Sequence, residues 1–137
     1  AVTKRGSKIL GICLGMQLLA NSSKENGYTK GLGLIDAEVD RFDIDNILPL
    51  KVPHIGFNRV TNSGQGTLFK YIKSSSDFYF VHSYRMLAQE QIGYSSICKY
   101  GEEFLAGYEN NNIFAVQFHP EKSQTNGLTL LNNYIKF

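Results

Sequence analysis

The stretch KILGICLGMQLLA, residues 8–20, decides the fold, because an apolar run there turns abruptly into a helical pattern. Gly11 and Gly15 flank Cys13 at the point of the turn, in a Gly-x-Cys-x-Gly pattern. In a strand–turn–helix context this pattern is typical of a nucleophile elbow, where side chains at the two flanking positions would clash. We therefore predict that Cys13 stands above the edge of a sheet, at a helix N-terminus that favours its thiolate.

A second segment, FHPE at residues 118–121, directly follows the nearly continuous apolar run 113–118. A thiol nucleophile needs a base, and the base needs an acceptor that orients it. His119 can supply the imidazole and Glu121 the carboxylate, because side chains two positions apart on an extended chain leave on the same side. An isolated His-x-Glu is usually a surface turn. Here it follows a buried-type strand, where open α/β sheets build their sites.

The apolar periodicity outside these two segments predicts the remaining elements. Turn-forming residues at 109–112 indicate a hairpin between the last two strands. Residues 21–33 should form an exposed loop, and residues 66–72 carry apolar side chains at helical spacing. We predict strands over 8–12, 37–42, 54–60, 78–82, 93–100, 103–108 and 113–118, and helices over 14–20 and around 128–135. Strands flanked by helices at both ends indicate an α/β class.

Composition limits the kind of protein. The 137 residues fit one domain, 1–137, and 42% hydrophobic against 19% charged residues favours a packed core. A net charge of +2 is too small for a nucleic-acid or membrane electrostatic footprint, so neither is expected as a partner. The sequence contains no bilayer-length apolar run and only two cysteines, which suits a reduced, cytoplasmic compartment.

The other candidate side chains carry weaker signals. His54 and His82 lack the spacing of metal ligands, so no metal site is predicted. Cys98 has no glycine elbow and is interpreted as structural. No phosphate-binding loop is present, and no cofactor is expected.

Together, GICLGMQLL at 11–19 and QFHPE at 117–121 resemble the class I (triad) glutamine amidotransferases. The resemblance implies the three-layer open sheet of that family. It also implies that Cys13 is the nucleophile, His119 the general base and acid, and Glu121 the group that orients His119. The implied substrate-binding positions are the N–H of Leu14 as an oxyanion donor, Gln17, and the backbone of Ser83 and Tyr84. The implied substrate is L-glutamine, hydrolysed to glutamate and ammonia.

Three further segments, VPHIGFN at 52–58, YFVHSY at 79–84 and HPEKSQ at 119–124, resemble the histidine-biosynthesis branch of the family. Members of that branch are glutaminase subunits of imidazole glycerol phosphate synthase, and they pass ammonia to a synthase (cyclase) subunit. Phe57 stands where they usually carry Trp. Three alternatives stay open: a related glutaminase for surface-polysaccharide amino sugars, a non-catalytic partner-docking remnant, and a stand-alone cysteine hydrolase.

Family members also carry strands and a glycine-bearing loop before the elbow, and that loop donates a second oxyanion N–H. Here only a polar, basic stretch, 1–8, precedes the first strand. The resemblance therefore implies that 1–137 is the C-terminal portion of a longer domain. On that expectation, the chain alone would lack one oxyanion donor and leave a sheet edge unpaired.

Overall fold

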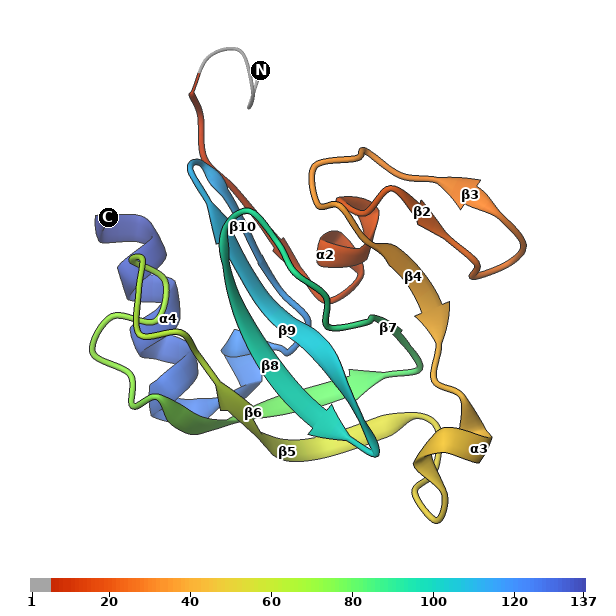
Figure 1. The fold of residues 1–137 in the computed structure, drawn as a ribbon. Helices are drawn as coiled ribbons and strands as arrows, with labels where there is room; N and C mark the ends of the chain where they lie inside the picture. Colours follow the sequence, from red (N-terminus) through yellow and green to blue (C-terminus); the bar gives the residue numbers. More distant parts are fainter. Residues whose placement is uncertain (1–5) are drawn as a thin grey trace.

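The computed structural model describes residues 6–137, so the first part of the basic stretch 1–8 lies outside it. The strands are β1 (Ile9–Ile12), β2 (Ser22–Ser23), β3 (Thr29–Lys30), β4 (Glu38–Arg41), β5 (His54–Thr61), β6 (Ser75–His82), β7 (Tyr84–Met86), β8 (Tyr94–Tyr100), β9 (Glu102–Asn110) and β10 (Ile113–Val116). The helices are α2 (Leu14–Leu18), α3 (Ile44–Ile47), the 3₁₀ turn η1 (Pro120–Lys122) and α4 (Gln124–Lys136) (Figure 1). The predicted elbow strand, hairpin strands and final helix are all confirmed.

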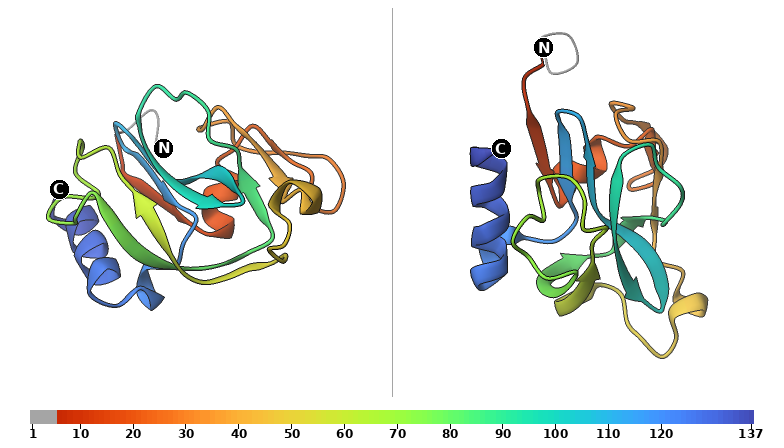
Figure 2. Two further views of the ribbon diagram at one scale, coloured as in Figure 1. Left: turned by 60° about the horizontal axis from the view of Figure 1, so that its bottom comes forward. Right: turned by 60° about the vertical axis from the view of Figure 1, so that its left-hand side comes forward.

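Six strands form a large sheet in the order β1-β10-β9-β8-β5-β6. β1 and β10 run parallel, with Gly11 opposite Ala115, whereas the other neighbours are antiparallel. The sheet is strongly curled, and β5 and β6 run across the ends of the other strands (Figures 1 and 2). Because β1 and β10 are parallel neighbours, the residues that follow them, Cys13 and His119, lie at the same edge of the sheet.

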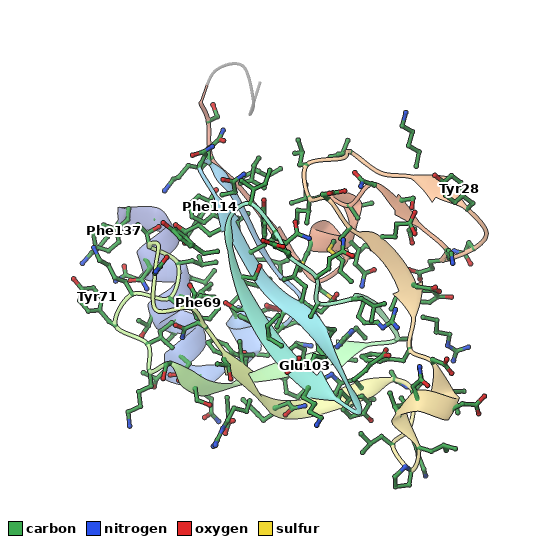
Figure 3. The ribbon with its side chains drawn as sticks, viewed as in Figure 1. Tyr28, Phe69, Tyr71, Glu103, Phe114 and Phe137 are labelled. Atoms are coloured by element: carbon green, nitrogen blue, oxygen red, sulfur yellow. The ribbon has the colours of Figure 1, made fainter. Side chains whose placement is uncertain are left out.

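A smaller sheet, in the order β3-β2-β4-β7, flanks the large one. The prediction of an exposed loop over 21–33 was wrong in one respect, because β2 and β3 pair there as a short antiparallel hairpin, although most of these residues are exposed. Asn26 and Gly27 both take positive φ, 57° and 87°, between its strands. An Asn-Gly pair adopts that conformation readily, so the turn signal was present in the sequence. Tyr28 beside it is 74% exposed, at the far end of the molecule from α4 (Figure 3).

Two hydrophobic cores cover the two faces of the large sheet. Successive residues of β10 alternate between them: Phe114 and Val116 belong to the core that includes Leu130 of α4, and Ala115 to the core that includes Met16 of α2. Figure 2 shows α4 on one side of the sheet and α2 with the small sheet on the other. The three-layer α/β arrangement expected from the sequence is thus confirmed.

The prediction of helical structure over 66–72 was wrong. This segment forms consecutive turns, and Tyr71 takes a φ of 66° within them. The carboxylate of Glu109 holds the segment by accepting hydrogen bonds from the backbone N–H of Thr67 and of Leu68. A distant carboxylate, rather than local periodicity, therefore determines this conformation.

The elbow helix is shorter than the predicted 14–20, because α2 ends at Leu18. The carbonyl of Leu18 accepts the N–H of Leu32, and the carbonyl of Leu19 accepts the N–H of Leu34. These carbonyls bind the returning chain instead of continuing the helix. α2 is consequently a single short turn packed against the loop that follows β3.

Candidate active site

Cys13 occupies a strained elbow between β1 and α2, with φ 54° and ψ −109°. Its N–H donates to the carbonyl of Val116 at 2.8 Å, which fixes the turn to β10. A Cβ on Gly11 would lie 2.7 Å from the carbonyl oxygen of Gly15, so a side chain at position 11 is excluded. The same reasoning was wrong for Gly15, where a Cβ would meet open space. The elbow thus depends sterically on the first glycine of the pattern.

Cys13 opens onto a cavity of about 340 Å³ between the elbow and the β6–β7 connection. The cavity brings together Cys13 with all four predicted substrate-binding residues, although they come from two distant segments. Its lining consists of Cys13, Leu14, Gln17, Glu25, Val81, His82, Ser83 and Tyr84. A second cavity of about 350 Å³ lies between Phe57 and the start of α4 and contains none of the predicted site residues. We therefore place the candidate site in the first.

His119 and Glu121 form the predicted pair, with the Nδ1 of His119 2.9 Å from a carboxylate oxygen of Glu121. This contact leaves the Nε2 of the imidazole available for a reacting group. The backbone around His119 is held firmly, because its N–H donates to the carbonyl of Tyr79 at 2.9 Å. Ser123 also links this segment to β6, because its hydroxyl donates to the His119 carbonyl and accepts the Tyr79 N–H.

The environment of the Cys13 thiol differs from the expected one. Burial raises the pKa of this thiol above its ordinary value, although hydrogen bonds from the Leu14 N–H and the Gln117 amide oppose that rise. The carboxylates of Glu121 and Glu25 add to the rise by charge repulsion. Because α2 is only one turn long, its dipole does not overcome these effects. In this state the sulfur is a thiol at neutral pH and needs a base.

Among residues 6–137, the sulfur of Cys13 contacts the carbonyl of Val81 at 3.9 Å and the Nε2 of Gln117 at 3.6 Å, and the imidazole of His119 is not among its hydrogen-bond partners. The structure thus places the predicted nucleophile and the His119–Glu121 pair at one sheet edge without a direct hydrogen bond between sulfur and imidazole.

Gln17 makes contacts that the sequence did not predict. Its side-chain Nε2 donates to the carbonyl of Tyr84 at 3.0 Å and to the Oε1 of Gln117 at 3.1 Å. Gln117 was overlooked as a functional candidate, although it opens the quoted segment QFHPE. The available signal was an amide within an otherwise apolar strand end, since a buried amide must find partners.

His54 and His82 form a second, buried pair, with 2.9 Å between the Nδ1 of His54 and the Nε2 of His82. The amide of Asn58 can donate to the Nε2 of His54, and the Nδ1 of His82 lies 2.9 Å from the carbonyl of Tyr84. Donation therefore runs in one direction, Asn58 to His54 to His82 to Tyr84, with both imidazoles neutral. Burial lowers the pKa of His54 to about 3 and that of His82 to about 4.

Cys98 lies in the middle of β8 and is 1% exposed, as expected for a structural cysteine. Burial raises the pKa of its thiol to about 12. Within the described residues, no group of three His, Cys, Asp or Glu side chains is arranged to hold a metal ion. The helices in this part of the chain are too short or too polar to cross a membrane.

Comparison with known proteins bears on what this arrangement does. The family model for "Glutamine amidotransferase class-I" matches residues 1–136. The chain is 44% identical to "Imidazole glycerol phosphate synthase subunit HisH" of Moorella thermoacetica over 133 residues, which is 97% of this chain and 61% of that protein. It is 47% identical to "Imidazole glycerol phosphate synthase subunit HisH 1" of Campylobacter jejuni, over 93% of this chain and 62% of that protein. It thus spans about three-fifths of the length of these relatives.

Two solved structures share the fold. A putative GMP synthase protein of Thermoplasma acidophilum superposes with a TM-score of 0.65 at 22% identity, over 98% of this chain and 58% of that one. A glutamine amidotransferase of Thermotoga maritima superposes with a TM-score of 0.63 at 17% identity, over 98% of this chain and 49% of that one.

Proposed function

Because the chain belongs to the class I glutamine amidotransferase family, we propose that it hydrolyses L-glutamine to glutamate and ammonia with Cys13 as nucleophile, His119 as base and acid, and Glu121 as orienting group. One observation carries the proposal: the strained cysteine elbow opens onto the cavity formed with Leu14, Gln17, Ser83 and Tyr84, beside the His119–Glu121 pair. We place the protein in the cytoplasm, where the thiol stays reduced.

The first half of the reaction transfers the glutamyl group to sulfur. His119 takes the Cys13 proton, and the thiolate attacks the carbon of the side-chain amide of glutamine. The carbonyl oxygen becomes an oxyanion that the N–H of Leu14 stabilises. When the C–N bond breaks, the imidazolium returns its proton to the departing nitrogen, and ammonia leaves. The raised pKa of the free thiol makes this base indispensable.

The second half regenerates the enzyme. Water attacks the glutamyl thioester while His119 accepts the water proton. The C–S bond then breaks to release glutamate, and the imidazolium returns its proton to the Cys13 sulfur. The cavity walls suit the amino-acid end of the substrate: the carboxylate of Glu25 complements an α-ammonium group, and the backbone of Ser83 and Tyr84 offers hydrogen-bond partners.

We further propose that the ammonia passes to a synthase subunit of the histidine pathway, which forms imidazole glycerol phosphate. The support is the identity to relatives whose names describe them as subunits of that synthase. Ammonia in neutral water is mostly protonated and not nucleophilic, so direct transfer to a docked partner preserves its reactivity. Ile55 and Phe57 on β5 are 60% and 50% exposed, and exposed apolar side chains of this kind suit such an interface.

The test is glutamate release by the full-length protein, with and without the synthase and its acceptor substrate. We expect the partner to stimulate turnover and Cys13→Ala to abolish it. Phe57→Ala should reduce the stimulated rate and leave the basal rate unchanged. Ile92→Ala is the matched control, because Ile92 is 93% exposed on the loop between β7 and β8. Equal rates with and without the partner would leave a glutaminase without partner control.

A further inference from the structure

We propose that Gln117 is a positioning residue for the nucleophile, donating from its side-chain amide to the sulfur of Cys13 and thereby holding the sulfur and favouring its thiolate form. This inference rests on the proposed function, because it assigns Gln117 to the same thiol. It differs from the triad roles, because Gln117 has no acid–base function and acts through Cys13 alone.

Gln117 is fully buried, with no exposed side-chain area, and follows β10 between the elbow and His119. Its backbone is fixed, because its N–H donates to the carbonyl of Ala106 at 2.9 Å. A buried amide that lost its partners would destabilise the fold. Among the described residues every buried side-chain nitrogen and oxygen has a partner. The partners of Gln117 are the Nε2 of Gln17 and the sulfur of Cys13, so its amide bridges the elbow helix and the thiol.

The neighbouring groups determine which end of the Gln117 amide faces the sulfur. The carbonyl of Tyr84 can only accept, so the nitrogen of Gln17 must face it. The second N–H of Gln17 then points to Gln117, whose oxygen must face Gln17. The nitrogen of Gln117 is left for the sulfur, at 3.6 Å. Gln117 thus presents its N–H donor to the sulfur rather than its amide oxygen, which would repel a thiolate.

The carbonyl of Tyr84, which orients the Gln17 amide, also accepts a hydrogen bond from a second side chain. This second donor is the Nδ1–H of His82, at the end of the chain that begins at Asn58 on β5. Two donors therefore converge on one carbonyl, and both belong to fully or largely buried side chains. Such a network keeps the Gln17 and Gln117 amides in one orientation, because reorienting either would leave a buried donor without an acceptor.

A donor at this position has a chemical use in both halves of the reaction. Sulfur carries negative charge before it attacks glutamine and again when the thioester breaks. The hydrogen bond from Gln117 strengthens at both moments, because donors bind charged acceptors more tightly than neutral ones. The Leu14 N–H is the other donor acting on this thiol, and the two oppose the effect of burial.

The experiment measures the rate of Cys13 alkylation by iodoacetamide against pH in the full-length protein, with the labelled peptide identified by mass mapping. This readout reports the thiol directly and does not require turnover. In Gln117→Met, which removes the donor, we expect the kinetic pKa of Cys13 to rise by about one unit, a tenfold loss of thiolate at fixed pH. In Gln117→Glu, which keeps an acceptor for Gln17 but replaces the N–H donor by an oxygen, we expect a larger rise.

Asn133→Leu is the matched control. Asn133 is another buried amide, 2% exposed, and it donates to the carbonyls of Leu68 and Lys70 far from the thiol. This variant should lower the thermal midpoint and leave the alkylation profile of Cys13 unchanged. If Gln117→Met fails to fold, Gln117→Glu decides the question. Profiles for both Gln117 variants that superpose on the wild type would show a purely structural role and overturn the inference. Absence of wild-type glutamate release would instead overturn the proposed function, whatever the alkylation profiles show.

Discussion

The two cysteines of this chain lie on the same sheet in opposite surroundings. Cys98 sits in the middle of β8, packed in the aromatic core, and burial alone raises the pKa of its thiol to about 12. Cys13 sits just beyond the end of β1, half-buried, where burial is opposed by the Leu14 N–H and the Gln117 amide. The elbow around Cys13 offers the Leu14 N–H and an open cavity, whereas the core around Cys98 offers apolar contacts.

The difference shows that position along a strand determines what a thiol can do. In the interior of β8, backbone N–H groups are used in the sheet ladder and apolar side chains surround the sulfur. At the end of β1 the chain leaves the ladder, and the strained turn directs the N–H of Leu14 toward the sulfur. We therefore predict that the reactive thiol is the one at which regular strand pairing stops.

The largest expected effect concerns turnover. Cys13→Ala should lower glutamate release in the presence of the synthase by at least roughly 10⁴-fold, the loss expected for its proposed role as covalent nucleophile. Cys98→Ala, which removes only the sulfur from the core, should stay within about threefold of wild type, because Cys98 lies outside the cavity onto which Cys13 opens. Comparable losses of glutamate release in the two variants would show that both thiols serve the reaction. The contrast between the elbow and the core of β8 would then be wrong.

Covalent labelling compares the reactivity of the two sulfur atoms directly. A glutamine-like diazo-ketone should modify the full-length protein once, on Cys13, because only that sulfur lies in the cavity. Cys98, with a thiol pKa of about 12, is about one ten-thousandth thiolate at pH 8. Peptide mass mapping should find the label on Cys13 in at least roughly a hundredfold excess. Label mainly on Cys98 would assign the reactive thiol to the core.

The two residues proposed to assist Cys13, His119 and Glu121, should contribute unequally to turnover. His119→Ala removes the base and should be roughly 10- to 100-fold more damaging to kcat than Glu121→Gln, which removes only the orienting charge. The carboxylate side chain of Glu121 is 51% exposed, and solvent weakens its hold on the imidazole. The measurement is kcat for glutamate release at saturating glutamine. If Glu121→Gln were as damaging as Cys13→Ala, Glu121 would act on the substrate or the sulfur directly.

The smallest effect is expected in the core region, as a dependence of stability on pH. The pKa values of His54 and His82, about 3 and about 4, lie below the ordinary value of 6.5, so the unfolded chain binds more protons in between. The associated stability is complete above about pH 6.5 and is lost progressively as the pH falls to about 3. We expect the thermal midpoint to drop by about 5 °C or more between pH 7 and pH 5.

Two variants test the origin of that drop. His54→Gln should flatten the pH dependence by removing one titrating group from the buried pair. His119→Gln should retain it, because His119 pairs with Glu121 at the sheet edge instead. An unchanged slope in His54→Gln would place the titrating groups outside the core.

Much of the site could be predicted because its signals are local. A glycine at position 11 and a cysteine two residues later fit a turn that sterics would otherwise forbid. Apolar runs on either side specify buried strands. Once β1 and β10 are parallel neighbours, Cys13 and His119 must share an edge, and the spacing of His119 and Glu121 permits their contact. For the same reason the α/β class followed from element order, whereas the three-layer sheet was expected from the family resemblance.

Other features required the tertiary structure, because their partners lie far apart in the chain. Gln17 and Gln117 are 100 residues apart, and the bond from Gln117 to Cys13 spans 104. The pairing of His54 with His82, the Glu109 contacts that replace a helix by turns, and the early end of α2 are likewise long-range.

The sequence by itself thus determined that Cys13 and His119 lie at the sheet edge that carries the candidate site. It did so through backbone sterics and apolar periodicity, which act over a few neighbouring positions. Only the tertiary structure decided how the thiol is solvated and which amide faces it. A pKa depends on burial and on the orientation of hydrogen bonds from every neighbouring strand, and no local pattern encodes either.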